Sequence, residues 1–192
     1  MARPRSFDED AALSAAMHSF RAHGFRNLSI KDIERATGLT SGSLYNAYRD
    51  KEGVFRAAVD HYVRHVIAAR LETFAGPQAT LDDLKGLLTS LFEMPQADGF
   101  GCLVTNSAIE FGSGPSPASD SIRQGLDLVD QAVRAVLRRH LPAERAETAA
   151  SRLILLYHGL LAMSRAGRAD DAARAAVEAE FHYLKSLQTN QR

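Results

Sequence analysis

Helix-start signals follow one another closely in a short stretch near the N-terminus, and this feature restricts the possible folds of the chain most. Ser29 precedes Asp32 by three residues, a pair typical of a helix N-terminus in which each side chain bonds the other residue's backbone. Gly38 then interrupts the helical pattern, and Thr40 or Ser41 provides the next N-cap. The sequence therefore predicts two very short helices separated by a tight turn.

The rest of the chain is also helical by pattern. Sustained alternation and β-branched runs are nearly absent and alanine is abundant, which favours an all-α fold. The helix after this stretch begins at the N-cap Asp50 and is stopped by Gly76 and Pro77. About nine helices are predicted, over residues 8–23, 30–36, 41–48, 51–75, 81–94, 101–111, 118–140, 143–165 and 170–187.

Composition leaves several classes of protein open. Lys and Arg number 23, as do Asp and Glu, so the net charge neither supports nor excludes a nucleic-acid partner. The single Cys102 excludes an internal disulfide framework, and acidic residues interrupt the apolar stretch that a signal peptide requires. The most apolar run, residues 153–163, is too short to span a membrane. We expect a cytoplasmic protein with no membrane segment.

Two short helices joined by a tight turn have the spacing of a helix-turn-helix, whose second helix lies in the DNA major groove. Such a helix exposes small and hydroxyl side chains at its start, where they reach base edges or phosphates. The candidates from this pattern are Thr40, Ser41, Gly42, Ser43, Tyr45, Asn46, Tyr48 and Lys51. For Tyr45 and Tyr48 the alternative is that they cover a small three-helix core.

The segment "LSIKDIERATGLTSGSLYNAYRDKEGVF" resembles the DNA-binding head of the TetR family of bacterial transcription regulators, and the resemblance extends over residues 7–55. It implies a homodimer, mostly a repressor, with a helical body that binds an inducer and adjusts the spacing of two heads. It also implies a helix-turn-helix domain over residues 1–52 and a ligand-binding and dimerisation domain over 53–192. The implied partners are a double-stranded DNA operator and a small-molecule inducer.

The resemblance also implies roles for individual positions. Lys31 matches a phosphate or groove contact on the second helix. Base-reading positions match Ser41, Gly42 and Ser43, and phosphate-contacting positions match Tyr45, Tyr48 and Lys51. Asn46 and Ala47 depart from the pattern, because many members have a His or aromatic pair there.

The sixth predicted helix mixes a thiol and polar groups with apolar residues along one face, which is typical of a pocket wall. The predicted ligand-binding residues are Tyr62, Val66, Leu88, Phe92, Cys102, Thr105, Asn106, Ile109, Leu128, Gln131, Tyr157 and His158. The alternative for each of them is a place in the core. Glu110 either pairs with a cationic ligand or faces water.

Cys102 supports an alternative function on the same scaffold. Its "GCL" context resembles one branch of the TetR family, in which some relatives use a cysteine there to detect electrophiles or oxidants. With no second cysteine, oxidation would yield sulfenic acid, an adduct or a bridge between subunits. The competing interpretation is an inert, small hydrophobic residue.

The last two predicted helices have the pattern of a dimerisation module. The eighth is apolar on more than one face, and a helix of this kind buries one side inward and the other against a partner. Two such helices from each subunit would form a four-helix interface with two-fold symmetry. The predicted interface residues are Leu156, Gly159, Leu160, Met163, Val177, Phe181 and Leu184.

Two other classes of protein compete with a DNA-binding regulator. Nothing resembles a GxSxG elbow, a phosphate loop or a Rossmann glycine run, so the sequence predicts no enzyme and no cofactor. His61 and His65 lie four residues apart on one helix face, but a third ligand is not apparent, and no metal site is predicted. A helical interaction module without DNA binding is the second rival.

Overall fold

The computed structural model describes residues 7–93 and 98–189, and within these ranges all regular structure is helical. The elements are α1 (Glu9–His23), α2 (Ile30–Thr37), α3 (Ser41–Tyr48), α4 (Lys51–Tyr62), η1 (Val63–Ile67), α5 (Ala68–Ala75), α6 (Leu81–Thr89), η2 (Ser90–Phe92), α7 (Leu103–Phe111), α8 (Ser119–His140), α9 (Ala143–Arg165) and α10 (Asp171–Thr189). The π-helical turn η1 joins α4 to α5 without a break, because its flanking residues keep helical backbone angles. Counting α4, η1 and α5 as one long helix, the described residues form nine helices, which confirms the predicted all-α fold.

Short-range caps explain the limits of the N-terminal helices. Ser29 and Asp32 form the reciprocal capping box that starts α2, and Gly38 ends this helix at a φ of 69°, where a residue with a Cβ is strained. Thr40 accepts a hydrogen bond from the backbone N–H of Ser43 at the start of α3. The Asp50 carboxylate accepts a hydrogen bond from the backbone N–H of Gly53 at the start of α4. Each bond lies within one turn, which is why the sequence pattern predicted these limits.

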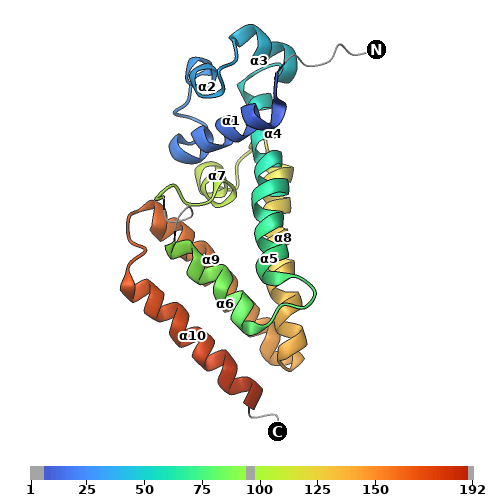
Figure 1. Cartoon of the computed structure of the whole chain (residues 1–192), viewed down its shortest axis with the longest axis vertical. Helices are drawn as coiled ribbons and strands as arrows, with labels where there is room; N and C mark the ends of the chain where they lie inside the picture. Colours follow the sequence, from blue (N-terminus) through green and yellow to red (C-terminus); the bar gives the residue numbers. More distant parts are fainter. Residues whose placement is uncertain (1–6, 94–97, 190–192) are drawn as a thin grey trace.

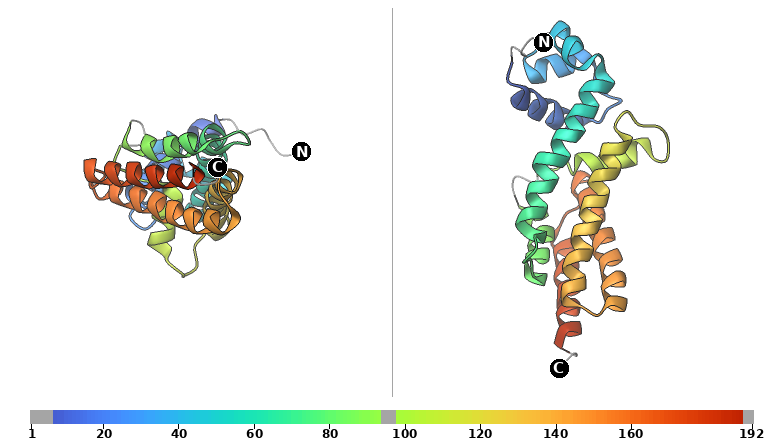
Figure 2. Two further views of the ribbon diagram at one scale, coloured as in Figure 1. Left: turned by 90° about the horizontal axis from the view of Figure 1, so that it is seen from below. Right: turned by 90° about the vertical axis from the view of Figure 1, so that its right-hand side faces the viewer.

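The molecule is elongated, with a head at one end (Figure 1). α1, α2 and α3 pack together there around the beginning of α4 (Figure 2). The long helix α4–η1–α5 then descends along the body beside α8, while α6 packs against α5 and α10. α7 lies directly below α1, at the junction between head and body. Two of the elements that join head and body are therefore the long helix and α7.

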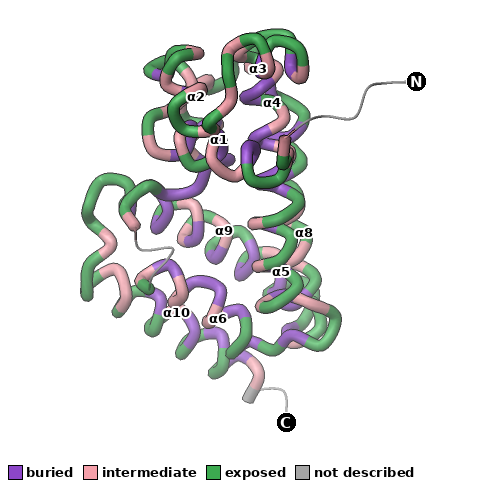
Figure 3. Tube along the Cα trace, turned by 45° about the horizontal axis from the view of Figure 1, so that its top comes forward, coloured by how far each residue is buried: buried purple, intermediate pink, exposed green. Residues whose placement is uncertain are grey.

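The core is continuous from head to body, as the buried segments of the chain trace show (Figure 3). Phe20 and Phe55 meet edge to face in the head with ring centroids 5.0 Å apart. The Phe25 ring contacts Phe55 and also Phe111 of α7, whose ring centroid lies 5.6 Å from that of Phe25, with the rings tilted in both pairs. This aromatic cluster fixes α7 against the base of the head, because such ring pairs add about 1 kcal/mol each to the burial of their surface.

α9 contains the most apolar run of the chain, and it packs closely against α8. Leu153, Tyr157, Leu160 and Leu161 are buried on its inner side. Among the helices of residues 7–93 and 98–189, none combines the length and the apolar character needed to cross a membrane.

Candidate DNA-binding face and ligand cavity

The start of α3 is an open surface of small side chains. Thr40 and Gly42 are exposed, Ser41 and Ser43 are half-buried, and Leu44 beneath them is buried in the head core. A Cβ added at Gly42 would meet only the Thr40 hydroxyl, at 3.8 Å, so the end of the helix is free to approach another surface closely. Tyr45 is 50% exposed on the same helix. Asn46 and, on α2, Lys31 are also exposed.

Tyr48 does not belong to this surface, contrary to its predicted phosphate-contacting role. Its side chain is 9% exposed and packs in the head core. Its hydroxyl donates a hydrogen bond to the carboxylate of Glu9 on α1, at 3.4 Å. The alternative named for the tyrosines, a role in covering the three-helix core, thus describes Tyr48 but not Tyr45.

Lys51 connects parts of the head. Its ammonium donates hydrogen bonds to the carbonyls of Phe25 and Leu28, each at 2.8 Å, and lies 4.2 Å from the centre of the Phe25 ring. Two of its three protons therefore hold the loop between α1 and α2 against α4. A phosphate contact by this residue would have to use the remaining proton.

A cavity of about 270 Å³ lies below the head, between α1, the long helix and α9. It is lined by Met17, His18, Arg21, Tyr62, Val66, Ile67, Arg70, Leu91, Asp98, Gly101, Cys102, Tyr157 and Leu161. Its walls are mostly apolar, with a few polar groups that converge on one space, as in sites for small molecules. Its volume is slightly below the range of roughly 300–1,000 Å³ that is usual for larger organic ligands.

Two arginines and one aspartate supply the charges of this cavity. Arg21 is 8% exposed and bonds the carboxylate of Asp98 at 2.7 Å and the Gly101 carbonyl at 2.6 Å. Arg70 donates to the carbonyl of Leu87 and to a serine hydroxyl. The lining thus carries one formal positive charge in excess.

Two phenols, Tyr62 and Tyr157, line this cavity near the thiol of Cys102. Burial, followed by the proximity of Cys102, raises the pKa of Tyr157 to about 12, although Arg70 partly opposes the shift. The same two causes raise the pKa of Tyr62 well above its ordinary value. Both phenols are therefore protonated at neutral pH and can donate hydrogen bonds to a ligand.

Only four of the predicted ligand-binding residues line this cavity: Tyr62, Val66, Cys102 and Tyr157. Leu88 is fully buried in the core, and Phe92 packs under Arg174. Leu128 and Gln131 line a shallow hollow on the outer side of α8. These four residues do not line this cavity, because helical periodicity gives the face of a residue but not the neighbour that covers it.

The three predicted ligand-binding residues on α7 do not line this cavity either. Ile109 is 67% exposed and points away from the cavity. Thr105 bonds His158 through its hydroxyl, 3.0 Å from Nδ1, so these two polar groups pair with each other rather than line the cavity. Asn106 donates to the carbonyls of Arg21 and Phe100 and thereby connects α7 to α1.

The sequence prediction missed that the head supplies part of the cavity wall. Met17, His18 and Arg21 come from α1, which was assigned to the DNA-binding domain alone. The sequence shows only that an arginine lies near the end of an amphipathic helix, and this does not identify a partner about eighty residues away.

A set of hydrogen bonds, here called the α7 joint, fastens the end of α1 to the body. Glu110 is half-buried and its carboxylate accepts the backbone N–H groups of Phe25 and Arg26 at 2.9 and 2.8 Å, so it pairs with the head backbone. Arg165 of α9 donates to the carbonyl of Arg21 at 2.6 Å. Asn106 and the Arg21 side chain complete the joint, and Arg21 belongs to the cavity as well.

The predicted dimer interface needs correction in α10. Val177, Phe181 and Leu184 are at most 1% exposed, so they pack inside the protomer and have no surface left for a partner. Leu160 is likewise buried, whereas Leu156 is half-buried. The apolar stripe of α10 is covered by α6, which the helical period alone could not show.

An apolar surface does exist on the outer side of the last two helices. On α9 it contains Gly159, where an added Cβ would meet nothing within 4 Å, and Met163, which is 43% exposed. Leu155 next to them is 74% exposed. On α10 the exposed side carries Ala176, Ala179 and Tyr183 at helical spacing, and Arg152 of α9 lies over the Tyr183 ring.

Comparisons with known proteins agree with these features. The family model for bacterial regulatory proteins of the tetR family matches residues 12–58. The HTH-type transcriptional repressor ComR of Escherichia coli (strain K12) is 46% identical over 61 residues, which cover 32% of this chain and 29% of ComR, less than a third of that protein. YezE of Bacillus subtilis (strain 168), an HTH-type transcriptional regulator, is 28% identical over 72% of this chain and 73% of YezE.

The similarity to solved structures extends over nearly the whole chain. A cysteine mutant of CifR, a TetR family transcriptional regulator in complex with 26-bp double-strand operator DNA, superposes with a TM-score of 0.78 at 26% identity. The superposition covers 94% of this chain and 98% of that one. A TetR regulator from Legionella pneumophila, 19% identical with a TM-score of 0.76, shares the fold over 96% and 98% of the two chains.

Proposed function

Because this chain belongs to the TetR family of transcriptional regulators, we propose that it is a repressor that leaves its operator when a small molecule occupies the cavity beside Cys102. It is a regulator and not an enzyme; repression, release by an inducer and homodimerisation are the proposed parts. The observation that carries the proposal is the position of Arg21. This one side chain lines the cavity, and it ties the last turn of α1 to Asp98 and Gly101 of the body.

The proposed sequence of events begins at the Arg21–Asp98 pair. A ligand in the cavity competes for the guanidinium or displaces the loop that carries Asp98 and Gly101. Because Arg165 and Asn106 bind the backbone carbonyl of the same arginine, a shift there moves the end of α1 relative to α7. The two heads of a dimer then lose the spacing that fits successive major grooves.

The cavity favours a particular class of inducer. Apolar walls, two protonated phenols and one excess positive charge suit a small neutral or singly anionic molecule with an acceptor oxygen. We propose Tyr157 and Tyr62 as the donors and Val66 as part of the apolar wall. Thermal-shift screening of small aromatic and aliphatic acids against their cationic amine analogues tests this: stabilisation by amines alone would contradict the proposed class.

The DNA contacts are proposed for the open end of α3, with Ser41, Gly42 and Ser43 at base edges and Lys31 and Tyr45 at the phosphate backbone. Exposure and small side-chain size support this assignment. We propose a domain division between residues 52 and 53, with α1 contributing residues both to the head and to the cavity wall. We propose the cytoplasm as the site of action, since the operator lies there.

We propose a homodimer formed through the outer side of α9 and α10. The exposed apolar residues Leu155, Met163 and Tyr183 and the open space at Gly159 support this surface. Light scattering on Leu155→Glu tests it, with Ile109→Glu as a matched control, because Ile109 is a similarly exposed apolar residue on α7. We expect monomers for the first variant and dimers for the second; dimers for both would refute this interface.

Selection of binding sites from a randomised DNA duplex pool tests the central proposal. We expect enrichment of a palindrome, with binding that weakens steeply with salt because phosphate contacts release counterions. Tyr45→Ala should lower the affinity, whereas His182→Ala, an exposed substitution on α10, should not. A pool without any enriched sequence would contradict the proposal and favour an interaction module.

A second candidate, covalent sensing, is favoured by one observation: the only thiol of the chain lies in the wall of the cavity. Addition of the Cys102 thiolate to an electrophilic alkene would form a C–S bond, and the thiol proton would be taken up at the neighbouring carbon. Cys102→Ser separates the candidates. Loss of release by electrophiles with retained release by neutral ligands would support the sensor, and retention of both responses would exclude it.

A further inference from the structure

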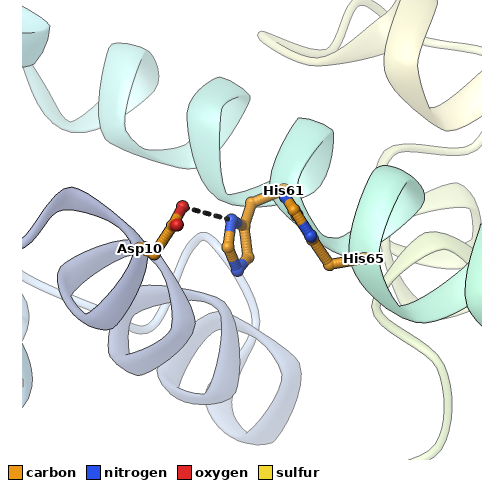
Figure 4. Close-up of side chains that lie close together, drawn as sticks. All are labelled: Asp10, His61 and His65. Atoms are coloured by element: carbon orange, nitrogen blue, oxygen red, sulfur yellow. Dashed lines mark ion pairs between the residues drawn. The ribbon is translucent and has the colours of Figure 1, made fainter.

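We propose that Asp10, His61 and His65 form a binding site for one divalent transition-metal ion of the zinc class, at the edge where α1 meets the long helix. Each of these three side chains offers a ligand atom, and the three atoms lie within 4.8 Å of one another. Two imidazoles and a carboxylate are a donor set that suits Zn²⁺ and its neighbours rather than Mg²⁺ or Ca²⁺. Figure 4 shows how the two histidines of the long helix and Asp10 of α1 converge.

The geometry needs only small side-chain movements to enclose an ion. A carboxylate oxygen of Asp10 lies 3.9 Å from Nδ1 of His61, too far for a hydrogen bond. Two ligand atoms on one tetrahedral zinc lie roughly 3.4 Å apart, given bonds of about 2.1 Å. Asp10 has a side chain that is 83% exposed and His65 is also exposed, so both can rotate by the required distance.

His61 is the fixed member of the cluster. Its ring is buried, and Ser14 of α1 lies 3.1 Å from Nε2. When Nε2–H donates to that hydroxyl, the lone pair of Nδ1 faces Asp10, which is the outer-shell arrangement that orients histidine ligands.

The backbone supports the convergence independently. The helix changes from α to π at Val63–Ile67, a turn that begins two residues after His61 and contains His65, and the N–H of Ala68 bonds the Val63 carbonyl five residues back. π-helical turns within α-helices are rare and are frequent at functional sites. The wider turn leaves the two imidazole rings with their centroids 4.4 Å apart. From the sequence the pair lacked a third ligand, which the fold supplies from fifty residues away.

A metal ion bound at this site would restrain the head. Asp10 belongs to α1, and the adjacent Glu9 accepts the hydrogen bond of Tyr48 at the end of α3. A bound ion would therefore hold the first turn of α1, and through it the end of α3, against the long helix. This consequence rests on the proposed DNA-binding function, whereas metal binding itself does not.

The test is metal binding by the full chain without a polyhistidine tag, after removal of metal with a chelator. Zn²⁺ is titrated against a chromophoric chelator, and Co²⁺ serves as a spectroscopic probe. We expect one ion per chain with imidazole–carboxylate coordination, and no competition by Mg²⁺ or Ca²⁺ in excess. Asp10→Asn with His65→Asn should abolish this binding, and Ser14→Ala should weaken it by roughly 10- to 100-fold.

His23→Asn is the matched control, because His23 is an exposed histidine of α1 outside the cluster. Its affinity for Zn²⁺ should equal that of the parent. Since Asp10 and His65 are exposed, the double variant should unfold at the parent's temperature without metal. Equal affinity of the parent and the double variant would overturn the site. Binding without any change in operator affinity would overturn only its proposed action on the head.

Discussion

The head of this protein is attached to the body in two different ways. At the α7 joint, Glu110, Asn106 and Arg165 reach backbone groups of α1 and the following loop through individual hydrogen bonds. At the other side the chain runs uninterrupted from the head into α4, η1 and α5. A continuous helix transmits displacement, whereas a set of separate polar bonds can open. In the proposed mechanism, the α7 joint would therefore be the part that switches and the long helix would be the lever.

The largest effect is expected from breaking the α7 joint at its buried charge. Arg21→Met leaves Asp98 without its partner, and we expect a loss of about 3 kcal/mol in the free energy of unfolding, measured by urea denaturation. Arg35→Met is the control, because the Arg35 side chain is 79% exposed and an exposed ion pair such as that with Asp32 contributes little to stability. Similar losses in the two variants would contradict a special role for Arg21.

Glu110→Gln should weaken the same joint, with a smaller loss in the free energy of unfolding. A neutral amide can accept through only one atom, so the charge-assisted pair of bonds to Phe25 and Arg26 is weakened by about 1–2 kcal/mol. Hydrogen exchange should accelerate at the amides of residues 24–28. Glu72→Gln, an exposed change on α5, should leave exchange there unaltered. Unchanged protection in Glu110→Gln would show that α7 does not hold the loop.

Lys51 and Lys31 separate two roles of lysine in the head: a contact that stabilises the fold and a contact to DNA. Lys51→Met removes two bonds to backbone carbonyls and should cost about 1–2 kcal/mol of stability. Lys31→Met, on the exposed side of α2, should change stability by less than about 0.5 kcal/mol. In operator titrations, Lys31→Met should reduce the salt slope by about 1. A stability loss of equal size in both variants would contradict the distinction.

The smallest effect concerns pH and lies in the body. Burial lowers the pKa of His158 below its ordinary 6.5, so the unfolded state binds more protons than the folded state in this range. Stability should therefore fall as the pH drops from about 6.5 towards the lower folded-state value. His158→Asn should flatten this part of the curve of unfolding free energy against pH. An unaltered slope in the variant would mean that His158 does not contribute to it.

The head could be predicted in detail because its information is local. Ser29, Gly38, Thr40 and Asp50 act within one helical turn, and all four caps lie where the sequence pattern placed them. Tyr48 was misplaced because the spacing of a short helix does not show which aromatic residue reaches the core.

The body was predicted as helices but not as contacts. The α10 stripe with Phe181 was assigned to a partner, although α6 of the same chain covers it. Arg21 and Asp98, like Asp10 and His65, are pairs brought together by the packing of distant helices. No periodicity within one segment contains that information, so cavities and clusters between helices require the structure.

The most direct test fills the cavity through the only thiol of the chain. Cys102 is alkylated with N-ethylmaleimide, and the amide exchange of Phe25 and Arg26 is measured together with affinity for the selected operator. Cys102→Ser, treated in the same way, controls for other modifications. We predict faster exchange at both amides and weaker operator binding in the alkylated protein only. Complete alkylation with unchanged exchange and unchanged affinity would contradict the coupling of the cavity to the head.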